Sequence, residues 1–248
     1  MSFFGELLES CDSTNDLAKE KGSLGPNQAP HGSWISARVQ SAGRGRLGRA
    51  WQSNRGNLFL SVILRPNKTQ YLTWIPLLGA VEVLEFLNSA QWGNWDQRRF
   101  SIKWPNDLWL DRKKLGGILC EAVNSVHNGS FVVFGLGLNT AEAPEGLDQL
   151  TASLEDSSLA DRIRQPLADA ISAAVLRLDD EGPEFIRKAF HRWTAFPLGS
   201  MVSWKANGEK LQGAVQGLGS SGELEVLLPS GQKKSLYAEE ISEVRSGL

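Results

Sequence analysis

The fold is decided by the stretch FSIKWPNDLWLDRKKLGGILCE, which runs from Phe100 to Glu121. Its three apolar runs are separated by two polar segments, Pro105-Asn106-Asp107 and Asp111 to Lys114. Turns this short join antiparallel neighbours in a sheet. Together with the apolar run from Phe131 to Leu138, the stretch predicts four adjoining strands, 100–104, 108–110, 115–121 and 131–138.

Segments on both sides of this block predict two further strands and four helices. The run from Leu58 to Leu64 is almost continuously apolar, which is typical of a strand buried on both faces. The other predicted strand is 34–39, and the predicted helices are 16–21 after the cap Ser13-Thr14-Asn15, 74–87, 159–178 and 184–193. Gln40 to Ser53 has no apolar periodicity and predicts a loop.

The sequence pattern changes after Pro197. Between Val202 and Val244, short strand-like pieces alternate with glycines at intervals typical of small antiparallel barrels. We therefore expect a domain boundary near Phe196, with a main domain over residues 1–196 and a small domain resembling an SH3 barrel over residues 197–248.

Composition limits the classes of protein to consider. The chain has 248 residues, 41% of them hydrophobic, and a formal net charge of -2, whereas a protein devoted to nucleic acid is usually basic. No apolar run approaches the ~20 residues that span a bilayer, and residues 1–9 do not resemble a signal peptide. Cys11 and Cys120 have no metal or disulfide spacing, and we expect Cys120 in the core. We expect a chain in a reducing cytoplasm.

The most concentrated functional signal is the loop Gly43-Arg44-Gly45-Arg46-Leu47-Gly48-Arg49, which Trp51 follows. Glycines let the backbone approach a ligand, and arginines bind carboxylates or phosphates with paired hydrogen bonds. The loop therefore suits an anionic substrate. A Gly/Arg segment that binds single-stranded RNA, or a mobile basic loop, fits the composition equally well.

Three shorter motifs are ambiguous one by one. Lys103-Trp104-Pro105-Asn106-Asp107 lies between two strands, where Asn and Asp also serve as plain turn formers. Lys114 opens an apolar strand, and a lysine that points inward there would need an anion as partner. Gly116 and Gly117 after it allow close approach of a ligand. A hairpin turn with solvated lysines is the alternative interpretation of the same residues. The strand Gly135-Leu136-Gly137-Leu138-Asn139 has one bare face, open to a flat ligand or a packed neighbour.

Several common chemistries leave no trace in the sequence. No G-x-G-x-x-G leads into a helix, and no G-x-x-x-x-G-K-[ST] phosphate loop is present. His31, His127 and His191 are isolated, without the order of a catalytic triad or the spacing of metal ligands. Covalent catalysis and a dedicated zinc site are therefore not expected.

The order of the motifs closely resembles the biotin–protein ligase family. The matching motifs are D-S-T-N at 12–15, Q-x-x-G-R-G-R-x-G-R-x-W at 40–51, K-W-P-N-D at 103–107, K-L-G-G-I-L at 114–119 and G-x-G-x-N at 135–139. The similarity covers roughly residues 8–154 and, less specifically, the C-terminal segment. It implies an α+β catalytic domain with a mixed sheet and flanking helices, similar to class II aminoacyl-tRNA synthetases.

The resemblance also implies roles for individual residues. Lys114, Arg44 and Arg46 would be the catalytic side chains, with Lys114 at the biotin carboxylate and the α-phosphate. The substrate-binding set would be Ser13, Thr14, Asn15, Gln40, Gly43, Arg44, Gly45, Arg46, Lys114, Gly117 and Gly135. The ATP-binding set would be Arg49, Trp51, Lys103, Asn106, Asp107 and Asn139. We expect the loop to be mobile without ligand and to order over it.

The implied reaction uses ATP and biotin as substrates and Mg²⁺ on the pyrophosphate. Biotinyl-AMP would form first, and biotin would then pass to a lysine of the biotin carboxyl carrier protein or domain of acetyl-CoA carboxylase. Some members of the family carry an N-terminal winged helix that binds DNA; Asp12 leaves no room for one, so we expect the ligase-only class, with no DNA partner and no membrane partner. A homodimer is possible within the family.

Two rival hypotheses remain. A lipoate or octanoate ligase shares the fold, but that group typically carries an R-R-x-x-G-G-x-x-x-x-H loop, and no histidine follows the loop here. A nucleic-acid-binding module would use the Gly/Arg loop, against the net charge of -2.

Overall fold

The computed structural model describes residues 5–89, 91–93, 100–125, 128–206, 208–237 and 241–243. His127, Val244 and the ends of the two expected domains (residues 1–4 and 244–248) lie outside these ranges. No helix in these ranges combines the length and the apolar character needed to cross a membrane.

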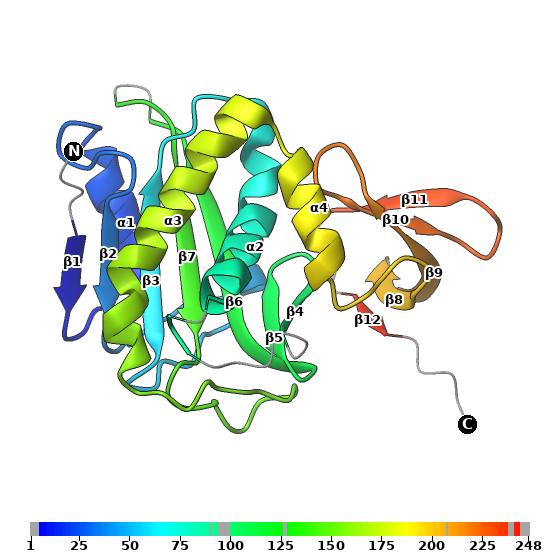
Figure 1. Ribbon diagram of the computed structural model, residues 1–248, viewed down its shortest axis with the longest axis horizontal. Helices are drawn as coiled ribbons and strands as arrows, with labels where there is room; N and C mark the ends of the chain where they lie inside the picture. The colour runs from blue at the N-terminus through cyan, green and yellow to red at the C-terminus, as the bar shows by residue number, and fades with distance from the viewer. Residues whose placement is uncertain are drawn as a thin grey trace.

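A seven-stranded sheet forms the centre of the main domain (Figure 1). Its strands are β1 (Gly5–Leu8), β2 (Trp34–Ala37), β3 (Leu58–Leu64), β4 (Phe100–Lys103), β5 (Asp107–Leu110), β6 (Lys113–Val123) and β7 (Phe131–Leu138), in the order β1-β2-β3-β7-β6-β5-β4. The four strands predicted from the stretch 100–121 and the run 131–138 are confirmed as antiparallel neighbours. The sheet is mixed because β1, which the sequence did not predict, pairs with β2 in parallel.

Helices cover both faces of the sheet. α2 (Ile75–Leu87) and α3 (Leu159–Glu181) lie over one face, and α4 (Glu184–Trp193) continues from α3 toward the C-terminal part of the chain (Figure 1). Gly79 lets α2 approach closely, since a Cβ there would lie 2.0 Å from the Phe134 ring. The other face of β3 and β7 packs with Ile63 and Val133 against Ala18 of α1 (Thr14–Ser23).

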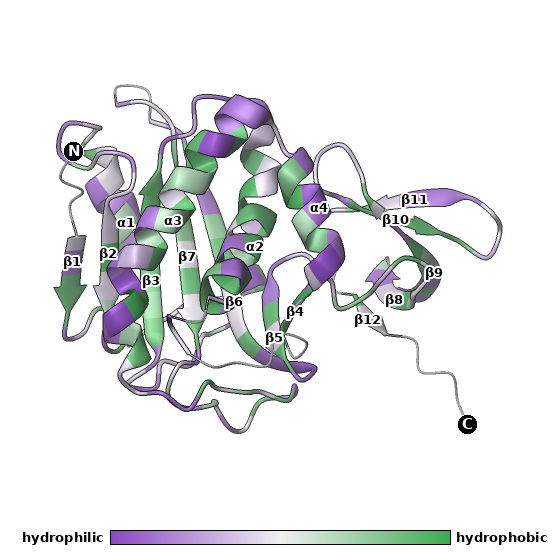
Figure 2. Ribbon diagram, in the orientation of Figure 1, coloured by the Kyte–Doolittle hydropathy of each residue, from purple (hydrophilic) through white to green (hydrophobic). Residues whose placement is uncertain are grey.

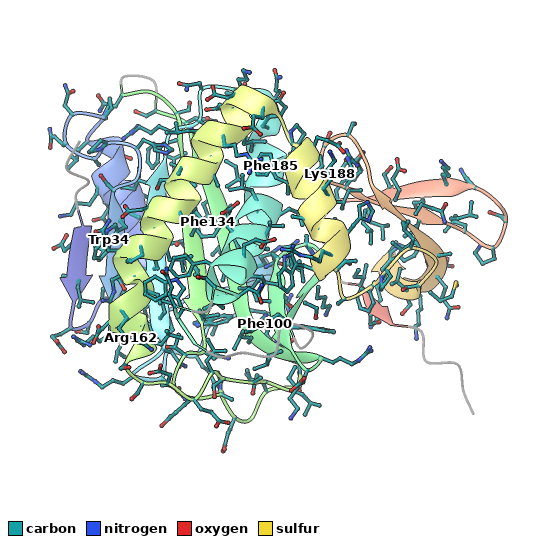
Figure 3. The ribbon with its side chains drawn as sticks, viewed as in Figure 1. Trp34, Phe100, Phe134, Arg162, Phe185 and Lys188 are labelled. Carbon is teal, nitrogen blue, oxygen red and sulfur yellow. The ribbon has the colours of Figure 1, made fainter. Side chains whose placement is uncertain are left out.

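Hydropathy follows this layering. The apolar colour of Figure 2 predominates along β3, whereas α3 alternates apolar and polar bands. All seven residues of β3 are buried, as the sequence predicted. Phe100, on β4, and Phe134, on β7, belong to the larger core cluster and are labelled in Figure 3. The side chain of Cys120 packs against this cluster, and burial raises the pKa of its thiol.

The C-terminal segment forms a separate antiparallel sheet. Its strands are β8 (Met201–Ala206), β9 (Glu209–Leu218), β10 (Leu224–Leu227), β11 (Lys233–Leu236) and β12 (Ser242–Glu243), in the order β11-β10-β9-β8-β12. In the described part of this sheet the outer strands β11 and β12 do not pair with each other. The structure therefore shows a small β-sheet, and closure into an SH3-like barrel remains a prediction.

The turn between β9 and β10 contacts the main domain. The indole Nε1 of Trp104 donates to the carbonyl of Gly222 at 3.1 Å, and that of Trp74 donates to the carbonyl of Ser220 at 3.2 Å. The Arg187 guanidinium, from α4, donates to the carbonyl of Gly219 at 3.0 Å. One core cluster contains residues of both sheets, so the two parts share a continuous apolar interior.

Candidate functional site

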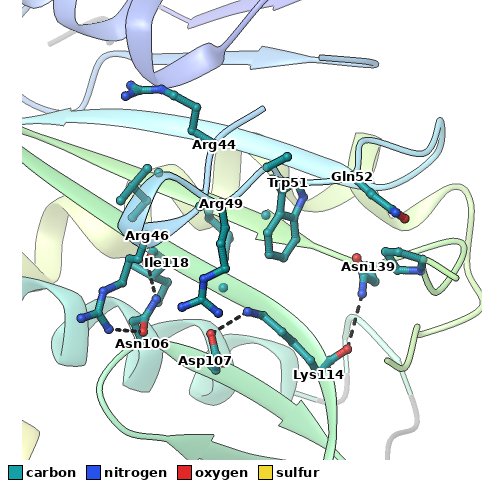
Figure 4. Close-up of a pocket in the computed structure, with 18 of the residues that line it drawn as sticks. Arg44, Arg46, Arg49, Trp51, Gln52, Asn106, Asp107, Lys114, Ile118 and Asn139 are labelled. Atoms are coloured by element: carbon teal, nitrogen blue, oxygen red, sulfur yellow. Dashed lines mark hydrogen bonds and ion pairs between the residues drawn. The ribbon is translucent and has the colours of Figure 1, made fainter. Parts of the chain in front are cut away.

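A cavity of about 430 Å³ lies over the face of the sheet that α1 partly covers (Figure 4). Glycines on β6 and β7 create the room beneath it. A Cβ at Gly135 would lie 2.1 Å from Asn15 Oδ1, and a Cβ at Gly137 would lie 2.4 Å from the Trp51 indole. The bare strand face predicted from the sequence is therefore filled by two of the chain's own side chains, and the cavity lies beside them.

One end of the cavity is lined by neutral polar side chains, with the ion pair of Arg44 and Glu121 at its edge. Ser13 caps α1 by accepting from the backbone N–H of Asp16 at 3.4 Å. The backbone N–H and the hydroxyl of Thr14 both donate to Gln40 Oε1, at 2.8 and 3.1 Å. Ser61 Oγ, on β3, donates to Asn15 Oδ1 at 2.6 Å. These contacts fix neutral donors and acceptors that suit an uncharged polar ring.

The other end of the cavity is cationic. Lys114 Nζ lies 2.9 Å from Asp107 Oδ1 and 5.5 Å from the centre of a Trp51 ring. Both Lys114 and Asp107 have side chains that are only 16% exposed. The Asp107 carboxylate is therefore the anion that the inward-pointing lysine needs. Arg46 Nη1 donates to Asn106 Oδ1 at 2.7 Å. Arg46 and Arg49 point toward Asn106 and Asp107 in Figure 4.

Basic side chains outnumber acidic ones around the cavity. The lining contains the bases Arg44, Arg46, Arg49, Lys103 and Lys114 and the acids Asp107 and Asp148. A chain with a formal net charge of -2 thus has a surplus of basic side chains around this cavity. Such a site attracts anions and stabilises charge that develops on them.

The Gly/Arg loop forms a small hairpin beside the cavity. Arg44 and Ala50 form a β-bridge, and the backbone N–H of Trp51 donates to the carbonyl of Gly43 at 2.8 Å. A short 3-10 turn, Arg46–Gly48, closes the tip, where Gly48 has φ +75°. Leu47 at the tip is 76% exposed. Arg44 points away from Arg46 and Arg49 in Figure 4 and is bound by carboxylates of α1 and β6.

Two buried polar atoms in the lining have no hydrogen-bond partner among the described residues. They are Trp51 Nε1, a donor, and Asn139 Oδ1, an acceptor. Asn139 Nδ2 is already engaged, because it donates to the Ala152 carbonyl at 3.0 Å. An unpaired buried polar atom is costly, so both atoms are suited to a ligand that completes their hydrogen bonds.

The structure brings together all but one of the residues expected at the site. Gly43 does not line the cavity: it is buried, and a Cβ there would lie 2.9 Å from the Trp51 carbonyl, so it allows the loop to close on itself. Lys103 lines the cavity while its ammonium lies 5.4 Å from the centre of a Trp109 ring.

Sequence reasoning missed the segment that follows β7. Pro144, Leu147, Asp148, Gln149 and Thr151 complete the lining. They lie in an irregular stretch without apolar periodicity, and nothing in their spacing signals a contact. The link is a backbone one: Lys114 N–H donates to the Leu150 carbonyl and Ala152 N–H to the Lys114 carbonyl, each at 2.9 Å.

No group of three or more His, Cys, Asp or Glu among the described residues could hold a metal ion. Asp107 and Asp148 are the only carboxylates among the lining residues.

Comparison with known proteins gives a consistent result. A family model described as the biotin/lipoate A/B protein ligase family matches residues 7–139. The bifunctional ligase/repressor BirA of Bacillus subtilis is 31% identical over 250 aligned residues, covering 96% of this chain and 74% of that protein. The biotin–[acetyl-CoA-carboxylase] ligase of Paracoccus denitrificans is 30% identical, covering 92% of this chain and 95% of that protein. BirA of Bacillus spizizenii is 36% identical over 163 residues, and the chain spans about half, 48%, of its length.

Solved structures agree. The biotin protein ligase from Aquifex aeolicus in complex with biotin and ATP superimposes with a TM-score of 0.78 at 26% identity, covering 98% of this chain and 99% of that one. The biotin protein ligase from Leishmania major in complex with biotinyl-5-AMP gives a TM-score of 0.60 at 26% identity, covering 96% of this chain and all of that one.

Proposed function

Because the chain belongs to the biotin/lipoate A/B protein ligase family, we propose that it joins biotin to AMP with ATP and transfers the biotin to a lysine of a carrier protein. The observation that carries the proposal is one cavity with a neutral polar end and a cationic end. Biotin has an uncharged polar ring at one end and a carboxylate at the other. The carboxylate would therefore lie where the bases gather.

We assign the neutral end to the biotin ring. Ser13, Thr14, Asn15 and Gln40 would bind it, above the room made by Gly135. The carboxylate end would extend past Gly117 toward Lys114. Gly45 and Arg46 of the loop would cover it, and Arg44 belongs to the same covering loop.

We assign the cationic end to the nucleotide. Lys114, Arg46 and Arg49 would neutralise the phosphates, with Lys103, Asn106 and Asp107 beside them. Trp51 and Asn139 would lie on the adenine side, where Trp51 Nε1 and Asn139 Oδ1 find no partner in the described part of the chain. A base that offers both a donor and an acceptor would pair with both atoms.

The first step brings two anions together. An oxygen of the biotin carboxylate attacks the α-phosphorus of ATP, a new P–O bond forms, and pyrophosphate leaves with the electron pair of the broken bond. Lys114 and Arg46 would neutralise charge at the reacting centre, because preorganised cations in a water-poor site act strongly there. Mg²⁺, when present, would supply further neutralisation on the pyrophosphate oxygens.

The second step consumes the mixed anhydride. The neutral ε-amine of the acceptor lysine attacks the biotinyl carbonyl carbon, the C–O bond to AMP breaks, and the amine loses a proton. Until then the intermediate must be kept from water. The Gly/Arg loop next to the cavity is placed to provide this cover.

Several finer expectations accompany the proposal. The acceptor would be a biotin carboxyl carrier domain of acetyl-CoA carboxylase, the relative in Paracoccus being named for that substrate. Residues 1–196 would be the catalytic domain and residues 197–248 an SH3-like barrel. The location would be cytoplasmic. A homodimer and the lack of a DNA partner stay predictions from the resemblance.

The deciding experiment is a complete ligation. The chain is incubated with biotin, ATP, Mg²⁺ and a purified biotin carrier domain, and the carrier is weighed by mass spectrometry. We expect the carrier to gain one biotinyl group on its acceptor lysine and nothing when that lysine is replaced by arginine. A folded carrier of unchanged mass would contradict the proposal. Gain of a lipoyl group from lipoate at an equal rate would instead favour the rival ligase.

A further inference from the structure

An ion-pair cluster at the edge of the cavity binds Arg44. Arg44 Nη2 lies 2.6 Å from Asp16 Oδ1, on α1, and 3.0 Å from Glu121 Oε2, on β6. Lys19 Nζ joins the same two carboxylates, at 2.8 Å from Asp16 Oδ1 and 3.0 Å from Glu121 Oε1. Two elements of the rigid core thus meet one side chain of the Gly/Arg loop.

Glu121 connects this cluster to the polar end of the cavity. Its Oε2 accepts from Asn15 Nδ2 at 2.9 Å as well as from Arg44. Asn15 is buried at the polar end, with its Oδ1 engaged by Ser61. One carboxylate oxygen therefore contacts both a residue that lines the cavity floor and the loop beside it.

Burial and charge indicate that the contacts matter for position. The Glu121 side chain is 23% exposed, and those of Arg44 and Asp16 are 40% and 46% exposed. Burial alone would raise the pKa of the Glu121 carboxyl. Hydrogen bonds from Asn15 and Lys19 and the charge of Arg44 outweigh burial, so the pKa lies below its ordinary value. The carboxylate is thus charged at neutral pH.

Arg44 lies at the base of the Gly/Arg loop. Arg44 pairs with Ala50 across the hairpin, so fixing Arg44 fixes both of its arms. Arg46 and Arg49, beyond Arg44, point into the cavity. Glycines at 43, 45 and 48 make the segment costly to order by its own backbone alone.

We infer that Asp16 and Glu121 are positioning residues, which bind the Arg44 guanidinium and thereby hold the Gly/Arg loop, residues 43–49, where Arg46 and Arg49 face the cavity. Arg44 is then the fastening side chain of the loop, and Arg46 and Arg49 are its ligand-facing side chains. The functional part of this inference rests on the proposed ligase activity. Its consequence is that loosening the fastening lets the adenylate escape before transfer.

Limited proteolysis tests the fastening without any need for activity. Chymotrypsin cuts after leucine, and Leu47 is exposed at the loop tip, so its cleavage rate measures how often the loop opens. Asp16→Asn removes one carboxylate and leaves Asn15 and Glu121 in contact. Exposed ion pairs contribute at most about 1 kcal/mol, which predicts cleavage up to about fivefold faster. Glu20→Gln is the matched control on the same helix, since Glu20 is exposed and no ion pair of it occurs in the described chain.

A double-mutant cycle identifies Arg44 as the group through which Asp16 acts. In the Arg44→Gln background, Asp16→Asn should change cleavage after Leu47 by less than about 1.5-fold, because the ion pair is already absent. An equal acceleration in both backgrounds would show that Asp16 acts on helix stability instead. No acceleration in either background would overturn the inference.

A second readout follows the intermediate. In Asp16→Asn we expect up to about fivefold more free biotinyl-AMP per pyrophosphate formed, with an unchanged KM for biotin. Glu121→Gln should show the same leak and also a raised KM for biotin, through Asn15. If the wild-type chain forms no pyrophosphate, the proposed function is wrong. The proteolysis still shows whether Asp16 holds the loop through Arg44. If it does and neither variant leaks more than Glu20→Gln, the loop is held by other contacts.

Discussion

The side chains of Asn15 and Trp51 take their places because Gly135 and Gly137 offer no Cβ. The sequence predicted a bare strand face but could not say what would cover it, since the two side chains arrive from segments about 120 and 86 residues away. A Cβ at either glycine would meet its neighbour at 2.1 or 2.4 Å, closer than real contacts allow. Each glycine therefore determines the position of one cavity residue.

We expect two reciprocal defects from alanine at these positions. Gly135→Ala should displace Asn15 and raise KM for biotin, with little effect on KM for ATP. Gly137→Ala should displace Trp51 and raise KM for ATP, with little effect on KM for biotin. A displacement of about an ångström at a ligand contact can lower the reaction rate on the order of a hundredfold, so the KM changes should be at least about tenfold. Steady-state kinetics with each substrate varied in turn measures both, and equal rises in both KM values for either variant would contradict the assignment of the two ends.

Lys114 carries the largest single electrostatic role in the proposal. Lys114→Ala should lower the rate of pyrophosphate release about a hundredfold to a thousandfold, since one preorganised contact to developing charge is worth ~3–4 kcal/mol. Lys113→Ala is the matched control, because Lys113 precedes it on β6 and is exposed. Near-normal release by a folded Lys114→Ala chain would return the lysine to the role of a hairpin residue paired with Asp107.

The two arginines of the loop show what the sequence could not separate. Arg44 and Arg46 both lie in the G-R-G-R repeat and were assigned the same catalytic role. In the structure Arg46 reaches Asn106, whereas Arg44 is bound by Asp16 and Glu121. The 3-10 turn that begins at Arg46 reverses the chain, and no local pattern encodes which arginine meets the distant carboxylates.

At the scale of elements, local signals predicted most of the fold. The cap at Ser13 and Pro76 in the first turn of α2 located two helix starts, and the apolar run of β3 located a central strand. β1 was missed because it has four residues with no fully buried side chain, and it depends on parallel pairing with β2. The cover of the cavity after β7 was missed for a similar reason, since backbone bonds to Lys114 and not side-chain periodicity place it.

Helix α2 carries a carboxyl group with an unusual titration. Burial, and then the like charge of Glu85, raise the pKa of Glu82 to about 7, although Arg177 opposes the shift. Glu82 lies in a groove with Phe185 and Lys188 of α4, which Figure 3 labels beside α2. The folded chain thus binds this proton more tightly than the unfolded chain.

The sign of the effect on stability follows from that difference. The free energy of unfolding should fall as pH rises from the ordinary carboxyl value of 4.5 toward about 7, because charging Glu82 disfavours the folded state. Glu82→Gln should remove this fall and stabilise the chain at pH 8 by about 1–3 kcal/mol. Urea unfolding at pH 5 and pH 8 measures it, with Glu20→Gln as the control. A variant no more stable than wild type at pH 8 would show that Glu82 is charged at little cost.

At the scale of the whole molecule, one contact between the two sheets involves a residue that lines the cavity. Trp104 lines the cavity, precedes Asn106 and Asp107, and donates its indole N–H to Gly222 in the C-terminal sheet. Trp74 makes the equivalent bond to Ser220 but does not line the cavity. The composition of the C-terminal segment predicted a separate small domain and gave no sign of this connection.

This contact gives a prediction with an internal control. Trp104→Phe leaves the Gly222 carbonyl without its donor, which costs about 1–3 kcal/mol in a buried site, and should raise KM for ATP while leaving KM for biotin unchanged. Trp74→Phe should lower the free energy of unfolding by a similar amount without changing KM for ATP. If both variants raise KM for ATP equally, the contact acts only through general stability.

The central claim is that the two ends of one cavity bind biotin and ATP so that the carboxylate meets the α-phosphate. Exchange of labelled pyrophosphate into ATP tests it most directly, because exchange requires the reversible first step and no acceptor. With wild-type chain, ATP and Mg²⁺, we expect label in ATP when biotin is added, none without it and none when lipoate replaces it. Exchange without biotin, or equal exchange with lipoate, would contradict the account.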